Sequence, residues 1–286
     1  MTDQAEGLRR LLGRDFVRIL TLTSSRTGMG KTTAILNLAA ALAGAGKNVM
    51  ILDENPGKAN LAAMLGAADA GDLLDVARYG KPLEEVMVAG PEGVAILQAS
   101  RGVQALAGLS EPEQQRLIDC MGNIARPADV VLVDTAAGSP GHLLSLTLDS
   151  QEVVVVLSPE GSAVTDAYAL IKMMNLQYGK RHFRILVNKV KNEEEGRAVF
   201  ESMSAVARRF LAVTLDFMGH VPFDGTLKQA SRLRRSVIET FPLSPASSSF
   251  RHIADSVMHW PCPQHISFGD FFHHLIQSSR LSAARA

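Results

Sequence analysis

A short segment near the beginning of the sequence contains the residue types of a phosphate-binding loop. It runs from Ser24 to Thr33, reads SSRTGMGKTT, and lies between an apolar run and a long stretch rich in alanine and leucine. A strand, a glycine-containing loop and a helix follow one another in this order at P-loop nucleotide sites. There the backbone amides and the helix N-terminus surround the phosphate groups. The segment therefore predicts a site for the phosphates of a nucleotide.

Two side chains of this loop have distinct expected roles. Lys31 should reach the β- and γ-phosphate oxygens, and the hydroxyl of Thr32 should bind Mg²⁺. Ser25 takes the place of the first glycine in the pattern G-x-x-x-x-G-K-[ST], so the motif is imperfect and a helix-capping turn is the alternative. We expect the nucleotide to be bound by the remaining loop residues, namely Thr27, Gly28, Met29, Gly30, Lys31, Thr32 and Thr33.

A carboxylate further along the chain has the position of a magnesium ligand. Asp134 directly follows the apolar run 130–133, and Thr135, Ala136 and Ala137 come next. A carboxylate at the end of a buried strand beside a phosphate loop can hold the magnesium shell. The alternative is a carboxylate that caps the next helix. The presence of the loop favours the magnesium interpretation.

The elements that must position these residues alternate along the chain. Helix-period stretches separate apolar runs that are rich in valine, isoleucine and leucine, which is typical of a parallel sheet covered on both faces. We predict one doubly wound α/β domain over residues 15–260, with a mostly parallel sheet. Its strands should lie at 16–23, 48–53, 94–97, 129–134, 152–157, 183–188 and 215–221, and its longer helices at 31–45, 110–124, 162–177 and 194–211.

Composition excludes several classes of protein. The 29 basic residues equal the 29 acidic ones, which gives no electrostatic footprint for sequence-independent DNA binding. No apolar run approaches the roughly 18 residues that span a bilayer, and the first residues do not resemble a secretory signal, so a cytoplasmic location is expected. Cys120 and Cys262 are too few for a disulfide scaffold and are interpreted as ordinary thiols.

A third segment identifies the superfamily. Residues 51–61 read ILDENPGKANL, which matches the D-x-D-x-G-x-x-N-L element of MinD/ParA proteins in spacing. Together with the loop, this segment identifies the chain as a member of that superfamily, and further segments resemble the FlhG (FleN) proteins that regulate flagellar number. The resemblance covers nearly the whole chain and includes residues 166–172, 187–190, 195–197, 219–224 and 244–247.

The resemblance implies an ATPase switch that uses ATP and Mg²⁺ and forms an ATP-dependent, face-to-face homodimer. Asn188 and Pro222 match positions that hold adenine in the family. The resemblance assigns Asp53 to the catalytic residues, with Lys31, Arg26 and Asn55, and also to the magnesium ligands, with Thr32 and Asp134. Arg26 takes the place of a lysine that crosses the dimer to the partner's phosphates. Arginine can do this work, because its planar fork binds phosphate and stays charged.

Three further departures from the family pattern concern activity. Asn55 replaces the aspartate thought to orient the attacking water, and an amide cannot accept a proton, so hydrolysis should be slow. Ser25 and Thr27 replace glycines, which should cost about 1–3 kcal/mol at each position that needs an unusual backbone conformation. Nucleotide affinity should be reduced for the same reason.

The N-terminal segment, residues 1–14, resembles a partner-binding element. Residues 3–9 read DQAEGLR and are similar to the D-Q-A-x-x-L-R element with which FlhG proteins stimulate the GTPase FlhF. The resemblance assigns Gln4, Leu8 and Arg9 to partner binding. A generic surface helix is the alternative.

The C-terminal segment, residues 261–286, follows a proline-containing break and carries an amphipathic stretch. MinD and FlhG proteins use such a helix to bind the inner face of the cell membrane in the ATP state, and phenylalanine suits the membrane interface. Docking in a groove of the protein's own core is the alternative. The residues assigned to the membrane face are Phe268, Phe271, Phe272, Leu275 and Ile276.

The leading functional hypothesis is therefore an ATP-dependent switch that binds the membrane and FlhF. A degenerate FlhG-like adaptor that does not hydrolyse ATP is a second hypothesis, supported by Ser25, Arg26 and Asn55. A DNA-segregating ParA protein is a third, for which the basic cluster 232–235 is the sequence support. A flagellar transcriptional regulator and proteins of the flagellar switch complex are further candidate partners, and no nucleic acid is expected.

Overall fold

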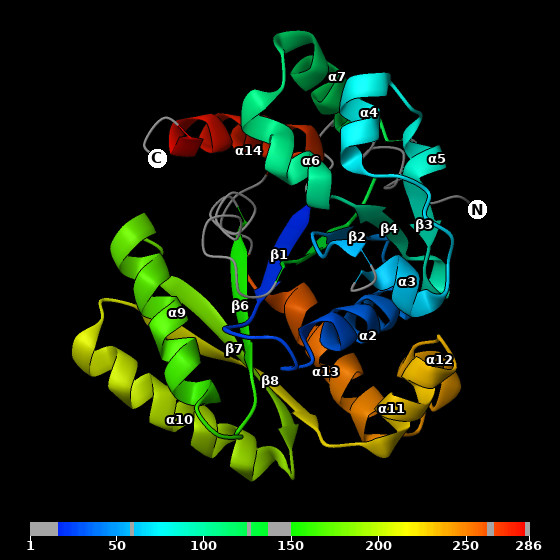
Figure 1. Ribbon diagram of the computed structural model, residues 1–286. Coiled ribbons are helices and arrows are strands. Elements are labelled where there is room, and N and C mark those ends of the chain that lie inside the picture. Colours follow the sequence, from blue (N-terminus) through cyan, green and yellow to red (C-terminus); the bar gives the residue numbers. More distant parts are fainter. Residues whose placement is uncertain (1–16, 58–59, 125–126, 137–149, 262–265, 284–286) are drawn as a thin grey trace, which may run out of the picture.

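The computed structural model describes residues 17–57, 60–124, 127–136, 150–261 and 266–283. These residues form an eight-stranded sheet with the order β3-β4-β2-β5-β1-β6-β7-β8 (Figure 1). The strands are β1 (Arg18–Thr23), β2 (Val49–Asp53), β3 (Met87–Ala89), β4 (Ala95–Gln98), β5 (Val130–Asp134), β6 (Glu152–Leu157), β7 (His182–Val190) and β8 (Thr214–Pro222).

All strand pairs of this sheet are parallel except β3 with β4. The predicted fold class and all seven predicted strands are confirmed. The strand β3 was not predicted, because its three residues are too few to show a hydrophobic period.

Helices cover both faces of the sheet, as the apolar runs predict. One face packs against α2 (Lys31–Gly44), α11 (Gly225–Arg232), α12 (Val237–Thr240) and α13 (Pro245–His259), and the short helix α3 (Leu61–Leu65) lies beside α2. The other face is covered over β6–β8 by α9 (Ala163–Tyr178) and α10 (Glu193–Phe210). Over β2, β4, β5 and β1 it is covered by α4 (Leu73–Tyr79), α5 (Leu83–Val86), α6 (Ser100–Ala105), α7 (Glu111–Gly122) and α14 (Phe268–Ala283).

The alternation of side chains along the strands explains these two layers. In β6, Val154 and Val156 pack with the α2–α13 layer, while Val153, Val155 and Leu157 pack with the α9–α10 layer. The central strand β1 lies between β5 and β6. The chain places β2 to β5 on one side of β1 and then crosses to place β6 to β8 on the other side, so the strand order reverses at β1. Ligands of such sheets bind at the carboxyl ends of the strands beside this point of reversal.

The C-terminal helix α14 forms where the sequence predicts it, but its apolar face has a different partner. Phe268, Phe271, Phe272, Leu275 and Ile276 are all buried in the core, against α7 and the sheet. In this conformation the five side chains occupy a groove of the protein's own core, as the alternative expects, and their assignment to a membrane surface stays a prediction for another state. An amphipathic stripe suits either environment, since both remove apolar side chains from water.

Close backbone contact makes this docking possible. At the start of α14, Gly269 lies against Gly122 at the end of α7, and a Cβ placed on Gly269 would lie 3.3 Å from the Cα of Gly122. Phe268 packs edge to face against Phe272, with ring centroids 5.1 Å apart. The helix is thus an integral part of one core cluster rather than a separate appendage.

The connection between α13 and α14 is held at both of its ends. Each end contacts residues at the amino ends of the strands. The carbonyl of Trp260 accepts a hydrogen bond of 2.8 Å from Arg18, and the Trp260 ring covers the Arg184 guanidinium at 3.6 Å. Arg184 is buried and paired with Glu152 at 2.9 Å. On the far side of the connection, the backbone N–H of Val17 donates to the carbonyl of Ile266 at 3.2 Å.

Some of the predicted elements lie outside the described residues. The N-terminal element with Gln4, Leu8 and Arg9, and also Cys262, lie outside the described part of the chain. Within that part, no helix combines the length and the apolar content needed to cross a bilayer.

Candidate nucleotide site

The phosphate loop connects β1 to α2 at the carboxyl end of the sheet. Gly28 and Gly30 both adopt φ values of 83°, in the left-handed region that glycine tolerates best. A side chain on Gly30 would also collide with the amide of Asn188. Neither Ser25 nor Thr27 is among the described non-glycine residues with positive φ. The expected backbone strain at these two positions is therefore absent, because the unusual conformations fall on the retained glycines.

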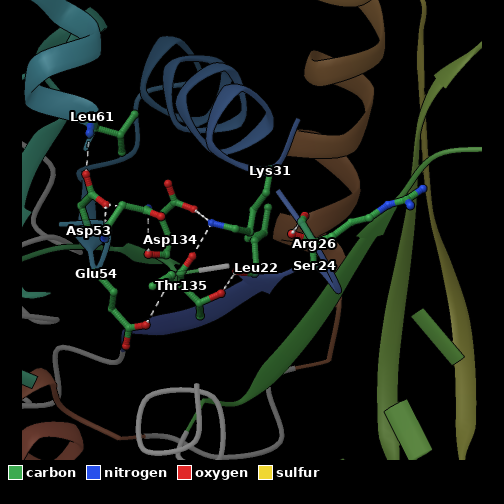
Figure 2. A network of polar contacts seen from close by, with 11 residues as sticks. Leu22, Ser24, Arg26, Lys31, Asp53, Glu54, Leu61, Asp134 and Thr135 are labelled. Atoms are coloured by element: carbon green, nitrogen blue, oxygen red, sulfur yellow. Dashed lines mark hydrogen bonds and ion pairs between the residues drawn. The ribbon is translucent and has the colours of Figure 1, made fainter. Parts of the chain in front are cut away.

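Lys31 and Asp134 meet at the centre of the site, as their spacing predicts. The ammonium group of Lys31 is buried and donates to Oδ1 of Asp134 and to the carbonyl of Thr135 (Figure 2). The Thr135 hydroxyl in turn donates to the carbonyl of Leu22 on β1, at 3.1 Å. Lys31, the first residue of α2, thus joins this helix to the end of β5 and to Thr135. Thr135 in turn joins them to β1.

The residues at this centre fit a magnesium ion. The second carboxylate oxygen of Asp134, Oδ2, is buried and has no hydrogen-bond partner. Thr32 is half-buried in the first turn of α2, directly after Lys31. No group of three or more histidine, cysteine, aspartate or glutamate side chains within the described ranges could hold a metal ion unaided. A magnesium ion here would therefore need phosphate or water oxygens as further ligands, which is its usual coordination.

Asp53 lies beside Asp134, because the register of β2 and β5 pairs these two residues. Its Oδ1 accepts from the backbone N–H and the side-chain amide of Asn55, at 2.9 and 2.8 Å, and its Oδ2 accepts from the backbone N–H of Leu61 at 2.5 Å (Figure 2). Burial, followed by the charge of Asp134, raises the pKa of Asp53 to about 6. In this conformation Asp53 holds the segment between β2 and α3 in place.

Asn55 is turned into the protein. Its amide nitrogen donates to Asp53 and makes a longer contact of 3.4 Å with the carbonyl of Asp134. The amide is therefore a structural donor between two strand ends. An aspartate at this position would place a second carboxylate against Asp53, which explains physically why an amide suits this arrangement.

Glu54 is a site residue that the sequence analysis missed. Its side chain is buried, Oε2 accepts from the backbone N–H of Ala136 at 3.4 Å, and Oε1 has no partner. Burial is the main cause that raises the pKa of Glu54 to about 8. The available signal was a carboxylate placed directly after Asp53 at the end of a buried strand.

Arg26 is held within its own chain. Its guanidinium lies 3.5 Å from the carboxylate of Asp166 on α9 and donates to the Ser162 hydroxyl and the Glu160 carbonyl, each at 3.3 Å. The side chain is 41% exposed, so this ion pair is well solvated and weak. Reaching a second protomer would require Arg26 to leave Asp166.

Asn188 lies close to the phosphate loop and is hydrogen-bonded to it. Its amide donates to the carbonyl of Met29 at 2.8 Å, and the ammonium group of Lys189 donates to the carbonyl of Gly28 at 2.8 Å. Lys189 adopts a φ of 61°, and the pairing of β7 with β8 is irregular between Asn188 and Val190. The structure thus brings the end of β7 onto the phosphate loop, with half-buried Pro222 at the end of the neighbouring strand.

Comparisons with known proteins agree with this geometry. Residues 20–237 match the CobQ/CobB/MinD/ParA nucleotide binding domain. The antiactivator FleN of Pseudomonas aeruginosa is 38% identical over 272 residues, which cover 94% of this chain and 96% of FleN. The flagellum site-determining protein YlxH of Helicobacter pylori is 29% identical over 239 residues, 83% of this chain and 80% of YlxH.

The solved MinD cell division protein of Aquifex aeolicus superposes with a TM-score of 0.66 at 24% identity, over 86% of this chain and 98% of MinD. This likeness concerns the fold. The domain match and the identity to FleN carry the family assignment, which confirms the resemblance found in the sequence. The chain belongs to the CobQ/CobB/MinD/ParA nucleotide-binding family, in the branch that includes FleN.

Proposed function

We propose that this protein is a switch that binds ATP with Mg²⁺, dimerises in the ATP state and regulates the number and placement of flagella. The observation that carries the nucleotide part is the position of Lys31 between the phosphate loop and Asp134, whose Oδ2 is buried without a partner. A buried acceptor with no partner is rare unless a ligand or ion completes it.

Loading of the site requires Lys31 to change partners. Thr32 and Asp134 would hold the magnesium ion, which supplies charge neutralisation at the β and γ phosphates when bound. Neutralisation of Asp134 by the metal would release Lys31 to the phosphate oxygens. We therefore expect ATP to bind much more tightly with magnesium than without it, and calorimetric titration of both forms tests this.

Hydrolysis is expected to be slow, because the amide of Asn55 is directed at Asp53 and cannot accept a proton from water. The variant Asn55→Asp should raise ATP turnover once magnesium has reduced the negative charge around Asp53. Steady-state turnover of the wild type and the variant measures this. Unchanged or lower turnover in a folded variant would show that position 55 does not limit the reaction.

Membrane association would require α14 to leave its groove. The five apolar side chains of this helix are buried in the described conformation, so the protein should bind lipid vesicles weakly without ATP. Dimerisation would have to disturb the contact between α7 and α14 to release them. Vesicle sedimentation with and without Mg²⁺-ATP tests the proposal, and equal pelleting in both conditions contradicts ATP control.

The partner in this proposal is the GTPase FlhF, approached through residues 2–12. A helix this short is marginal in water and would order on its partner. Gln4 carries a neutral amide that can donate to a phosphate and orient a water. GTP hydrolysis by FlhF should therefore rise with a peptide of residues 1–20 and not with its Gln4→Ala variant. A wild-type peptide without effect contradicts this partner.

A second function, that of an adaptor which does not hydrolyse ATP, is favoured by three contacts. Lys31 is occupied by Asp134, Asn55 by Asp53 and Arg26 by Asp166. ATP binding and turnover, measured with and without vesicles, separate the two functions. Binding with measurable turnover supports the switch, and absence of turnover in every condition supports the adaptor.

A further inference from the structure

Two adjoining cavities lie at the amino ends of the strands, on the side of the sheet that α7 and α14 cover. The larger, about 200 Å³, lies at the first residues of β2 and β4. The smaller, about 160 Å³, lies between Val17 and the start of α14. Ile124 and Ala128 line both cavities, so the two form one depression, which we call the strand-end groove.

The lining of the strand-end groove is apolar and incompletely covered. Met87, Ala95, Ile124 and Ala128 pack against the core of the α7–α14 layer, yet each of them is only half-buried. Exposed Glu84 adds a negative charge to the wall of the larger cavity. Apolar side chains that gather in one depression at the surface are typical of an interaction site. The groove therefore fits an apolar segment that also carries positive charge.

The described residues begin at the wall of this groove. Val17 lines the smaller cavity, and its backbone N–H donates to the carbonyl of Ile266, so residues 1–16 are joined to the fold at the groove itself. Three strand spacings separate β1, which follows Val17, from β4. At about 4.8 Å per spacing, the groove extends over roughly 14 Å. A helix of about nine residues covers that distance.

The nine residues directly before Val17, residues 8–16, have the composition that the groove requires. Three arginines among them supply positive charge opposite Glu84. Their apolar members stand at i, i+3, i+4 and i+8, which places them on one face of a helix. These members are Leu8, Leu11, Leu12 and Phe16.

We propose that the N-terminal segment docks in the strand-end groove of its own chain, with the apolar face of residues 8–16 against Ile124 and Ala128. The segment is tethered at Val17, so docking needs no encounter between molecules and forms at any protein concentration. The length of the groove, its apolar lining and its negative charge all match this segment.

Docking would link the two ends of the chain. Phe268 and Gly269 of α14 line the smaller cavity, so departure of this helix removes part of the groove and frees the N-terminal segment. Docking also covers Leu8, which the contact with FlhF needs, so the groove and FlhF compete for one surface. This competition rests on the function proposed above, whereas the docking itself does not.

Hydrogen exchange of the full-length protein without nucleotide tests the docking. The backbone amides of residues 8–16 should exchange at least about tenfold more slowly than in a free peptide of residues 1–20, because docked amides exchange only when the segment opens. Ala128→Phe fills the groove and should return these amides to the rate of the peptide. Ala205→Phe adds the same side chain at an exposed position of α10 and should leave the protection intact.

A variant of the segment itself makes the test independent of changes in the core. Leu12→Asp should abolish the protection while the amides of the strands exchange as in the wild type. Unprotected amides in the wild type overturn the proposal, and so does protection that survives in either Ala128→Phe or Leu12→Asp. Protection that disappears on dilution of the protein also overturns it, because a second copy of the chain then fills the groove.

GTP hydrolysis by FlhF separates the docking from the function proposed above. Full-length Ala128→Phe should stimulate FlhF more strongly than the wild type, because a larger fraction of its N-terminal segments is free to bind. Equal stimulation by the two proteins, with the segment released in the variant, contradicts the competition but not the docking. Absence of stimulation by both proteins and by the peptide contradicts FlhF as the partner.

Discussion

Lys31 and Asp134 form a buried ion pair, and both residues belong to the proposed nucleotide site. Removal of one partner of such a pair leaves an uncompensated buried charge and costs about 3–5 kcal/mol. We predict that Lys31→Met lowers the free energy of unfolding of the nucleotide-free protein by this amount. The double variant Lys31→Met/Asp134→Asn should recover most of the loss. Urea unfolding measures both, and a stable single variant would mean that the pair does not form in solution.

Glu54 should make the stability of the nucleotide-free protein depend on pH. Its pKa is raised by burial from 4.5 to about 8, so the folded state keeps a proton that the unfolded state loses. The stabilisation is fully present below about pH 4.5 and is lost as the pH rises through about 8. Asp53 acts in the same direction but only up to about pH 6.

The variant Glu54→Gln isolates this contribution. Between pH 6 and 8 the free energy of unfolding should fall with pH in the wild type, and the fall should be smaller in the variant. Urea titrations at several pH values give the two slopes. Parallel slopes would show that Glu54 is ionised throughout this range in the folded protein.

The individual site residues differ in how far sequence could predict them. Lys31, Thr32 and Asp134 follow from local order, because a strand end or a helix start fixes each of them. The inward turn of Asn55 and the contact of Arg26 with Asp166 depend on segments far apart in the chain. No spacing rule predicts such contacts. The surroundings of Glu54 likewise include Ala136, which lies 82 residues further along the chain.

At the scale of elements, the alternation of strands and helices could be predicted because the central strands β1, β2, β5, β6 and β7 are buried on both faces. Continuous runs of valine, isoleucine and leucine mark such strands. The spacing of apolar residues likewise predicts that α14 is a helix. It does not predict which surface covers the apolar face of that helix. An amphipathic stripe predicts which face of a helix is removed from water, but not which surface covers that face.

The contact between Gly269 and Gly122 allows docking of α14 to be weakened without changing its apolar face. A valine at position 269 has no space against the backbone of α7. We predict that Gly269→Val increases sedimentation with anionic lipid vesicles in the absence of ATP, because a helix pushed off its groove exposes the five apolar side chains. Gly108→Val is the matched control, because a Cβ added at Gly108 meets no other atom within 4 Å. Identical sedimentation of both variants and the wild type would argue that α14 is a permanent core element.

At the scale of the whole molecule, the nucleotide edge of the sheet is expected to become a dimer face. Arg26 is the loop residue that could act across it, since its present ion pair with Asp166 is solvated and easily broken. We predict that Arg26→Ala binds Mg²⁺-ATP as a monomer and dimerises at least tenfold more weakly than the wild type. Arg26→Lys should restore dimerisation, because it returns a cation to the same position. Light scattering over a range of protein concentrations checks this, and full dimerisation of the alanine variant would contradict a role across the dimer.

The attachment of Trp260 at the amino ends of the strands also sets a mechanical limit. Only seven residues, 261–267, connect it to the first turn of α14, and a fully extended chain spans about 3.5 Å per residue. If the helix leaves α7, this connection keeps the first residue of α14 within roughly 28 Å of Trp260. A membrane that captures the helix must then lie close to the amino ends of the strands. The opposite edge, where the nucleotide would bind, would face away from the lipid and stay open to partners.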